Sequence, residues 1–261
     1  MCTLIILNGL PGPWPVILAA NRDEFYDRPS APPHFISTAP PIFAGQDLRA
    51  GGTWMGVTPS GFFAGLTNQR MAGPAPTGRR SRGEVVTQTL AAGSRAAARR
   101  YLESVDPAAY NPFNLVFGDA AGLEVVYARD TMQFVTVPLG LHVLPNGVLD
   151  DPAFPKVDRA QALLAELSTD GETVLTQMAA VLGDTTPPTA LPDEPEFPFP
   201  ASVRAALHSL CVRTPRYGTC SASIVALRPG GVARYLFAEG APDEAAFVDL
   251  SAALEAGETS R

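Results

Sequence analysis

The residue with the clearest catalytic potential is Cys2, which directly follows Met1. Removal of Met1 would make Cys2 the first residue, and its free α-amine, with a reference pKa of about 7.7 to 8.0, could then take the thiol proton directly or through water. Such a nucleophile needs no histidine, and His34, His142 and His208 stand in unrelated sequence contexts. The alternative interpretation is that Cys2 is a small buried apolar residue that opens a strand.

A second group of charged side chains lies in the segment Asn21-Arg22-Asp23-Glu24, at the end of a predicted strand. If the first two strands pair as a hairpin, this strand end lies beside residue 2. Arg22 could then favour the thiolate form of the cysteine, and Asp23 could hold the ammonium group. The alternative is a polar strand end with solvent-exposed ion pairs.

The segment Gly51-Gly52-Thr53-Trp54 indicates a place where two backbones approach closely beside a bulky aromatic side chain. Together with Met55, Phe62 and Phe63, Trp54 could line a pocket for an apolar acyl group. Aromatic residues at strand spacing are also typical of a hydrophobic core, so this second interpretation stays open.

Composition excludes several classes of function. The chain has 261 residues, 46% of them hydrophobic, and a formal net charge of −7. This length is sufficient for a large core, and we expect one domain over residues 1–261. The acidic balance argues against a nucleic-acid partner. Lys156 is the only lysine; it has no phosphate-loop glycine frame before it, and we expect it to be a solvated charge at the start of a helix.

The three cysteines, Cys2, Cys211 and Cys220, form no Cys-x-x-Cys pair. They therefore indicate neither a disulfide framework nor a zinc site, and we expect a reducing compartment with no metal or cofactor. No secretory signal is recognisable, and no run reaches the roughly 18 apolar residues of a membrane span. We expect a protein of the cytoplasm, and the sequence does not indicate its oligomeric state.

Hydrophobic periodicity and turn signals predict an α+β fold. We expect strands over residues 3–7, 16–21, 52–57, 62–68, 114–117, 124–128, 134–137, 141–144, 221–227 and 232–237. We expect helices over residues 94–105, 156–167, 172–182 and 243–254, and another that begins at a capping box formed by Ser81 and Glu84. The proline-rich stretch 185–200 is predicted to be a surface loop. Because strands and helices occur in blocks, two antiparallel sheets stacked between helical layers are favoured over a doubly wound parallel sheet.

Several motifs in one order carry a family resemblance. They are Met1-Cys2-Thr3, Asn21-Arg22-Asp23-Glu24, Ala50 to Gly56, Gly65-Leu66-Thr67-Asn68, Ser81-Arg82-Gly83, Asn146-Gly147 and Tyr217-Gly218-Thr219. With these motifs the chain resembles the NRDE family, named for its Asn-Arg-Asp-Glu tetrapeptide, which includes the transport-and-Golgi-organisation type proteins of eukaryotes. The resemblance implies the four-layer αββα fold of N-terminal-nucleophile hydrolases, similar to penicillin V acylases and bile-salt hydrolases.

The resemblance also implies roles for individual residues. Cys2 matches the nucleophile, and Arg22 and Asp23 match the arginine and aspartate that flank it. Asn68 is similar to the oxyanion-hole asparagine, whose amide would stabilise a tetrahedral intermediate by roughly 3 kcal/mol. Asn146 is similar to a second active-site asparagine. Considered without the resemblance, either asparagine would be interpreted as a turn residue.

The chain departs from the family pattern at Cys220, where relatives commonly carry an arginine. Either Arg213 or Arg216 of the same loop could substitute for it. The leading hypothesis is a hydrolase that acts on a linear amide or acyl compound through a Cys2 acyl-enzyme. The alternatives are a non-catalytic carrier of haem or an acyl-CoA-like amphiphile on the same fold, and a purely structural interaction module.

Overall fold

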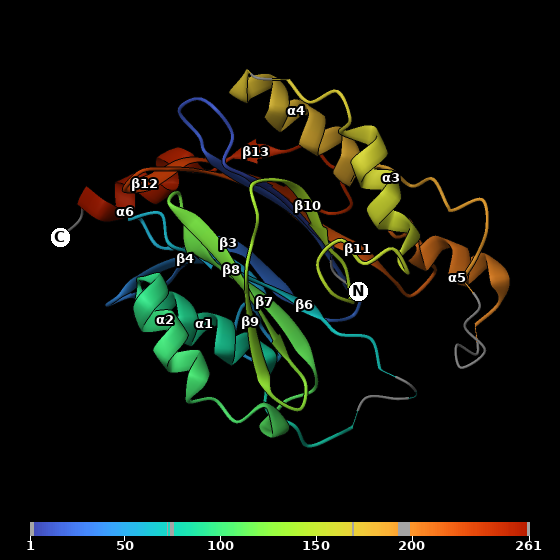
Figure 1. Cartoon of the computed structure of the whole chain (residues 1–261), viewed down its shortest axis with the longest axis horizontal. Helices are drawn as coiled ribbons and strands as arrows, with labels where there is room; N and C mark the ends of the chain where they lie inside the picture. Colours follow the sequence, from blue (N-terminus) through green and yellow to red (C-terminus); the bar gives the residue numbers. More distant parts are fainter. Residues whose placement is uncertain (1–2, 72, 74–75, 169, 193–198, 260–261) are drawn as a thin grey trace.

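A computed structural model describes residues 3–71, 73, 76–168, 170–192 and 199–259 (Figure 1). Within these residues the strands form two sheets in which every neighbouring pair is antiparallel. The first, six-stranded sheet has the order β10 (Gly140–Leu144), β1 (Thr3–Asn8), β2 (Val16–Phe25), β11 (Tyr217–Arg228), β12 (Gly231–Glu239), β13 (Val248–Asp249). The second, seven-stranded sheet has the order β3 (Ser30–Thr38), β4 (Pro41–Asp47), β5 (Met55–Val57), β6 (Phe63–Asn68), β7 (Phe113–Asp119), β8 (Gly122–Ala128), β9 (Met132–Thr136).

Helices cover the outer face of each sheet. The seven-stranded sheet carries α1 (Arg82–Ala92) and α2 (Arg95–Glu103), and the short helix η1 (Pro107–Ala109) follows them. The six-stranded sheet carries α3 (Pro155–Leu163) and α4 (Gly171–Leu182), with α5 (Ala201–Leu207) and α6 (Ser251–Thr259) further along the chain. Figure 1 shows the two helix pairs on opposite sides of the stacked sheets. The expected αββα layering is therefore confirmed.

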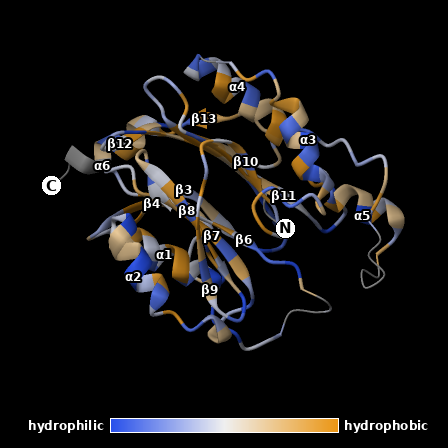
Figure 2. Cartoon of the chain, viewed as in Figure 1, coloured by the Kyte–Doolittle hydropathy of each residue, from blue (hydrophilic) through white to orange (hydrophobic). Residues whose placement is uncertain are grey.

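The alternation of side chains along β1 explains why both faces of the first sheet are covered. Leu4 and Ile6 point into the cluster between the two sheets, whereas Ile5 and Leu7 pack in the cluster beneath α3 and α4. Because successive strand residues point to opposite faces, an uninterrupted apolar run is what a strand buried on both sides requires. A third cluster fills the space between the second sheet and α1 and α2. Figure 2 shows hydrophobic residues along the strands and on the helix faces against them.

The structure adds two strands to those predicted and corrects two other predictions about elements. Residues 30–38 and 41–47, for which no element was predicted, form β3 and β4. Pro32 and Pro33 are compatible with β3 because it is an edge strand, where a missing N–H is tolerated. The helix expected over 243–254 is wrong in its first half, where β13 lies, and α6 begins only at Ser251. Ser81 stands at the N-cap of α1 but makes no side-chain capping bond.

None of the helices in the described part of the chain has the length and apolar character that crossing a membrane requires.

Candidate functional site

The candidate site is built where β2 ends beside the start of β11. Thr3 pairs with Asn21 across β1 and β2, and Asp23 pairs with Thr219 across β2 and β11. The pairing shifts by one residue between Thr219 and Ser221, so Cys220 is the extra residue of a bulge. Bulges bend a strand and redirect its side chains, and they are common beside active sites.

Asp23 is a buried carboxylate that is 4% exposed. Thr219 Oγ1 donates a hydrogen bond of 2.7 Å to its Oδ1 atom, and the same hydroxyl accepts a bond of 2.9 Å from the backbone N–H of Val212. Burial raises the pKa of the Asp23 carboxyl, while the positive charge of Lys156 and the hydrogen bond from Thr219 act in the opposite direction. A buried carboxyl that is oriented by a hydrogen bond, as Asp23 is by Thr219, is a suitable partner for a cationic amine.

Arg22 is 5% exposed, and its guanidinium lies 4.4 Å from the ring centroid of Trp54. Stacking on an indole stabilises a desolvated guanidinium. Its only hydrogen bond among the described residues runs from Nη1 to Ser30 Oγ at 3.4 Å. Among the residues that the structure describes, no carboxylate lies within ion-pair distance of the Arg22 guanidinium. The guanidinium therefore retains donors for another group.

The structure brings four of the predicted site residues onto one cavity of about 340 Å³, namely Arg22, Asp23, Asn68 and Trp54. The segment 79–83, at the start of α1, also lines this cavity. A Cβ atom on Gly52 would lie 2.5 Å from the carbonyl carbon of Gly83. The predicted close approach of two backbones is therefore found here, and it holds the start of α1 beside Trp54.

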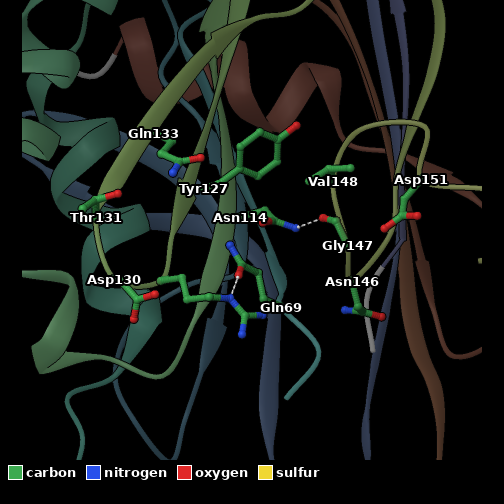
Figure 3. Close-up of a pocket in the computed structure, with 11 residues that line it drawn as sticks. Gln69, Asn114, Tyr127, Asp130, Thr131, Gln133, Asn146, Gly147, Val148 and Asp151 are labelled. Carbon is green, nitrogen blue, oxygen red and sulfur yellow. Dashed lines mark hydrogen bonds between the residues drawn. The ribbon is translucent and has the colours of Figure 1, made fainter. Parts of the chain in front are cut away.

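Asn68 and Asn146 are joined by a hydrogen bond. Asn146 Nδ2 donates to the backbone oxygen of Asn68 at 2.6 Å, and the N–H of Arg70 donates to the backbone oxygen of Asn146 at 2.8 Å. Asn146 itself lines a second cavity of about 290 Å³, together with Asn114 and Tyr127. In Figure 3 the loop that carries Asn146 and Gly147 faces Asn114, which donates a bond of 2.7 Å to the oxygen of Gly147. The two asparagines thus line different cavities, although a hydrogen bond joins them.

The structure does not bring Met55 and Phe62 to the cavity. Met55 is 2% exposed and packs between the two sheets, and Phe62 is 1% exposed and packs beneath α1. Both side chains therefore belong to the core, which was the alternative interpretation of their strand spacing. Trp54 is the only one of the three predicted substrate-binding residues that lines the cavity.

Cys220 faces a neighbouring cavity of about 550 Å³, which Arg22 and Arg213 also line. Burial raises the pKa of the Cys220 thiol, so it is protonated at neutral pH. Arg213 pairs with Asp243 at 2.7 Å and with Glu244 at 2.8 Å. These two carboxylates engage the guanidinium that was considered as a substitute for the family arginine.

Sequence reasoning misjudged Lys156, which is 1% exposed and therefore a buried residue of α3, not a solvated charge. It also assigned no role to Thr219, although the motif Tyr217-Gly218-Thr219 was noted, or to the arginines of the segment 79–82.

Cys2 lies outside the described residues, and Thr3 is the first residue that the structure describes. The described residues contain no group of three or more His, Cys, Asp or Glu side chains that could hold a metal ion.

Comparisons with known proteins agree with this architecture. Residues 1–239 match the family model described as Transport and Golgi organisation 2. The Transport and Golgi organization protein 2 homolog of Bos taurus is 30% identical over 239 residues, and that of Homo sapiens is 31% identical over 238 residues. Each alignment covers 83% of this chain and 83% of the relative.

Two solved structures share the fold. The Caenorhabditis elegans ortholog of N-acylethanolamine-hydrolyzing acid amidase aligns with a TM-score of 0.53 at 12% identity, covering 88% of this chain and 93% of that one. A mutant of the conjugated bile acid hydrolase from Clostridium perfringens aligns with a TM-score of 0.55 at 11% identity, covering 96% of this chain and 92% of that one. At these identities the similarity establishes the N-terminal-nucleophile hydrolase fold alone.

Proposed function

Because the chain belongs to the Transport and Golgi organisation 2 family and has the N-terminal-nucleophile hydrolase fold, we propose that it is a cysteine hydrolase of a linear amide or acyl compound. The observation that carries this proposal is the presence of Arg22, Asp23 and Asn68 on one cavity at the end of the strand next to β1. Cys2 is covalently joined to Thr3, whose partner in the register is the residue before Arg22.

Before the proposed reaction, an aminopeptidase hydrolyses the Met1–Cys2 peptide bond, which releases Met1 and frees the α-amine of Cys2. This amine takes the thiol proton, and the sulfur attacks the substrate carbonyl carbon to form a tetrahedral intermediate. The side-chain amide of Asn68, which makes no hydrogen bond within the described chain, donates to the oxyanion. Asp23 stabilises the protonated amine, and Arg22 favours the thiolate.

Collapse of the intermediate breaks the carbon–nitrogen bond. The leaving amine takes the proton from the Cys2 ammonium group and departs, so that a thioester between substrate and Cys2 remains. Water then attacks the thioester with the α-amine as base, and the thiol is regenerated together with a carboxylic acid. Each step uses only groups of this chain, the substrate and water.

The test compares the wild type with Cys2→Ala. We expect intact-mass measurement to find Met1 removed, one equivalent of iodoacetamide to react rapidly at neutral pH, and a panel of N-acyl amides to be hydrolysed. Cys2→Ala should abolish both the rapid labelling and the hydrolysis. Cys220→Ala is the matched control and should retain both, because burial raises the pKa of that thiol. A retained Met1, or hydrolysis by Cys2→Ala, would contradict the proposal.

A non-catalytic carrier of haem or an acyl-CoA-like amphiphile makes a different prediction. Such a protein would bind its ligand saturably, measured by absorbance for haem, and would hydrolyse no amide. Binding without turnover in the wild type would favour the carrier over the hydrolase.

A further inference from the structure

The cavity that holds Arg22 and Asp23 is rich in arginine, although the whole chain has a net charge of −7. Its lining contains five arginines and three carboxylates: Arg22, Arg28, Arg79, Arg80 and Arg82 against Asp23, Glu24 and Asp47. Three of these arginines come from one short segment, 79–82, which the proposed reaction does not use. An electropositive cavity in an acidic protein indicates a negatively charged ligand.

Two of the five arginines are neutralised by the protein itself. Arg28 pairs with Asp47 at 2.5 Å and with Glu24 at 3.6 Å, and Arg80 pairs with Glu84. These pairs engage two of the three lining carboxylates. The cavity lining also contains Arg22, Arg79 and Arg82.

Arg22 and Arg79 have no carboxylate within ion-pair distance among the residues that the structure describes. Arg22 is buried, with 5% of its surface exposed, whereas Arg79 is exposed to solvent. Both residues line the cavity. A buried guanidinium presents five N–H donors, and it makes strong bidentate bonds to carboxylates and phosphates. The cavity lining therefore holds one buried and one exposed guanidinium that no carboxylate of the described residues neutralises.

The start of α1 adds to this field. The helix has 11 residues, begins at Arg82, and has Ser81 at its N-cap with no side-chain capping bond. Ser81, Arg82 and Gly83 all line the cavity. The first-turn N–H groups of a helix and its macrodipole favour anions at this end. Guanidinium groups and a helix terminus therefore act on the same space.

We propose that this cavity selects an acyl substrate that carries an anionic oxygen group, a carboxylate or a phosphate, held by Arg79 and Arg82 at the start of α1. The scissile amide then lies toward Arg22, Asp23 and Asn68. The inference rests on the proposed hydrolase function for the bond that is cleaved, but anion binding itself requires no turnover. A neutral amide of the same length lacks the ionic contacts and binds more weakly.

The test measures binding to the full chain carrying Cys2→Ala, so that hydrolysis does not intervene. Three probes share a hexanoyl group: hexanoylglycine with a carboxylate, hexanoyl-O-phosphoethanolamine with a phosphate, and neutral hexanoylethanolamine. By calorimetry at low ionic strength, we expect at least one anionic probe to bind about tenfold more tightly than the neutral one. Which anion has the advantage distinguishes carboxylate from phosphate substrates. Added salt should reduce the advantage.

Variants then locate the site. In the Cys2→Ala background, Arg79→Gln or Arg82→Gln should reduce the preference for the anionic probe several-fold. Arg100→Gln removes the same charge from the exposed face of α2 and should leave the preference unchanged. Equal binding of all three probes, no binding of any probe at millimolar concentration, or an unchanged preference in both cavity variants would overturn the inference. Anion preference in a protein without hydrolytic activity would refute the hydrolase function and leave the anion site standing.

Discussion

The Oγ1 atom of Thr219 donates a 2.7 Å hydrogen bond to the carboxylate of Asp23, although the two residues are 196 positions apart in the chain. The same hydroxyl accepts a bond from the N–H of Val212, so it connects β2, β11 and the segment before β11. One side chain thus orients the carboxylate that we assign to the nucleophile's amine and also holds the loop behind it.

Replacing Thr219 should therefore destabilise the protein. Thr219→Val keeps the shape but leaves two buried groups, the Asp23 carboxylate and the Val212 N–H, without this partner. We expect a loss of about 1 to 3 kcal/mol in the free energy of unfolding, measured by urea denaturation. Thr219→Ser keeps the hydroxyl and should retain most of the stability. Equal stability of the valine and serine variants would show that the hydroxyl has no such role.

Asn21 should act as a structural residue, although it opens the Asn-Arg-Asp-Glu tetrapeptide. Its Nδ2 atom donates to the backbone oxygens of Leu182 at 2.8 Å and Leu210 at 2.9 Å, and the residue is 1% exposed. We expect Asn21→Ala to lower the free energy of unfolding by about 1 to 3 kcal/mol, because two buried carbonyls lose their donor. The exposed carboxamide variant Gln133→Ala should cost less than about 0.5 kcal/mol. A cost for Asn21→Ala as small as that of the control would argue against the structural role.

Local patterns were sufficient to predict most of the fold. The buried run of β1 and the turn-flanked strands β7 and β8 are continuous hydrophobic segments, and their existence follows from the pattern alone. The strand β3 could not be predicted in this way, because its prolines are compatible with a strand only at a sheet edge. Its position at that edge is a property of the tertiary structure.

The site was predictable to the extent that it lies in adjacent residues. Arg22 and Asp23 stand next to each other in the sequence, and both line the cavity. Thr219 approaches them only through the pairing of β2 with β11, which no local pattern specifies. Lys156 was misjudged for the same reason: a lone lysine at the start of a helix is usually exposed, and its burial depends on packing between distant elements.

Asp47 should make stability depend on acid pH. Burial alone would raise the pKa of its carboxyl, but the hydrogen bond from Arg28, aided by the N–H groups of Arg49 and Ala50, lowers the pKa below its ordinary value. A carboxyl with a lowered pKa in the folded state contributes stability above its unfolded pKa of about 3.9. That contribution is lost as the pH falls through the lower, folded-state value.

Unfolding measured from pH 6 down to pH 2 should therefore differ between the wild type and Asp47→Asn. We expect the variant to be less stable at pH 6 and the difference to shrink as the pH falls, because the wild type loses the charge that pairs with Arg28. Asp130→Asn, at an exposed carboxyl, serves as the control and should follow the wild type at every pH. A stability gap between wild type and Asp47→Asn that stays constant with pH would show that the charge of Asp47 does not stabilise the fold.

Gly45 should be required for the position of Trp54, and so for the stacking of Arg22. A Cβ atom on Gly45 would lie 2.6 Å from two atoms of the Trp54 ring and 3.3 Å from the backbone oxygen of Ala31, so Gly45→Ala must displace the indole. We expect a cost of about 1 to 3 kcal/mol in the free energy of unfolding, together with a changed tryptophan emission and slower alkylation of Cys2. Gly231→Ala is the matched control, because its nearest neighbours lie at 3.4 Å, an ordinary contact. Gly45→Ala with the stability and thiol reactivity of the wild type would show that the indole is free to move without affecting the site.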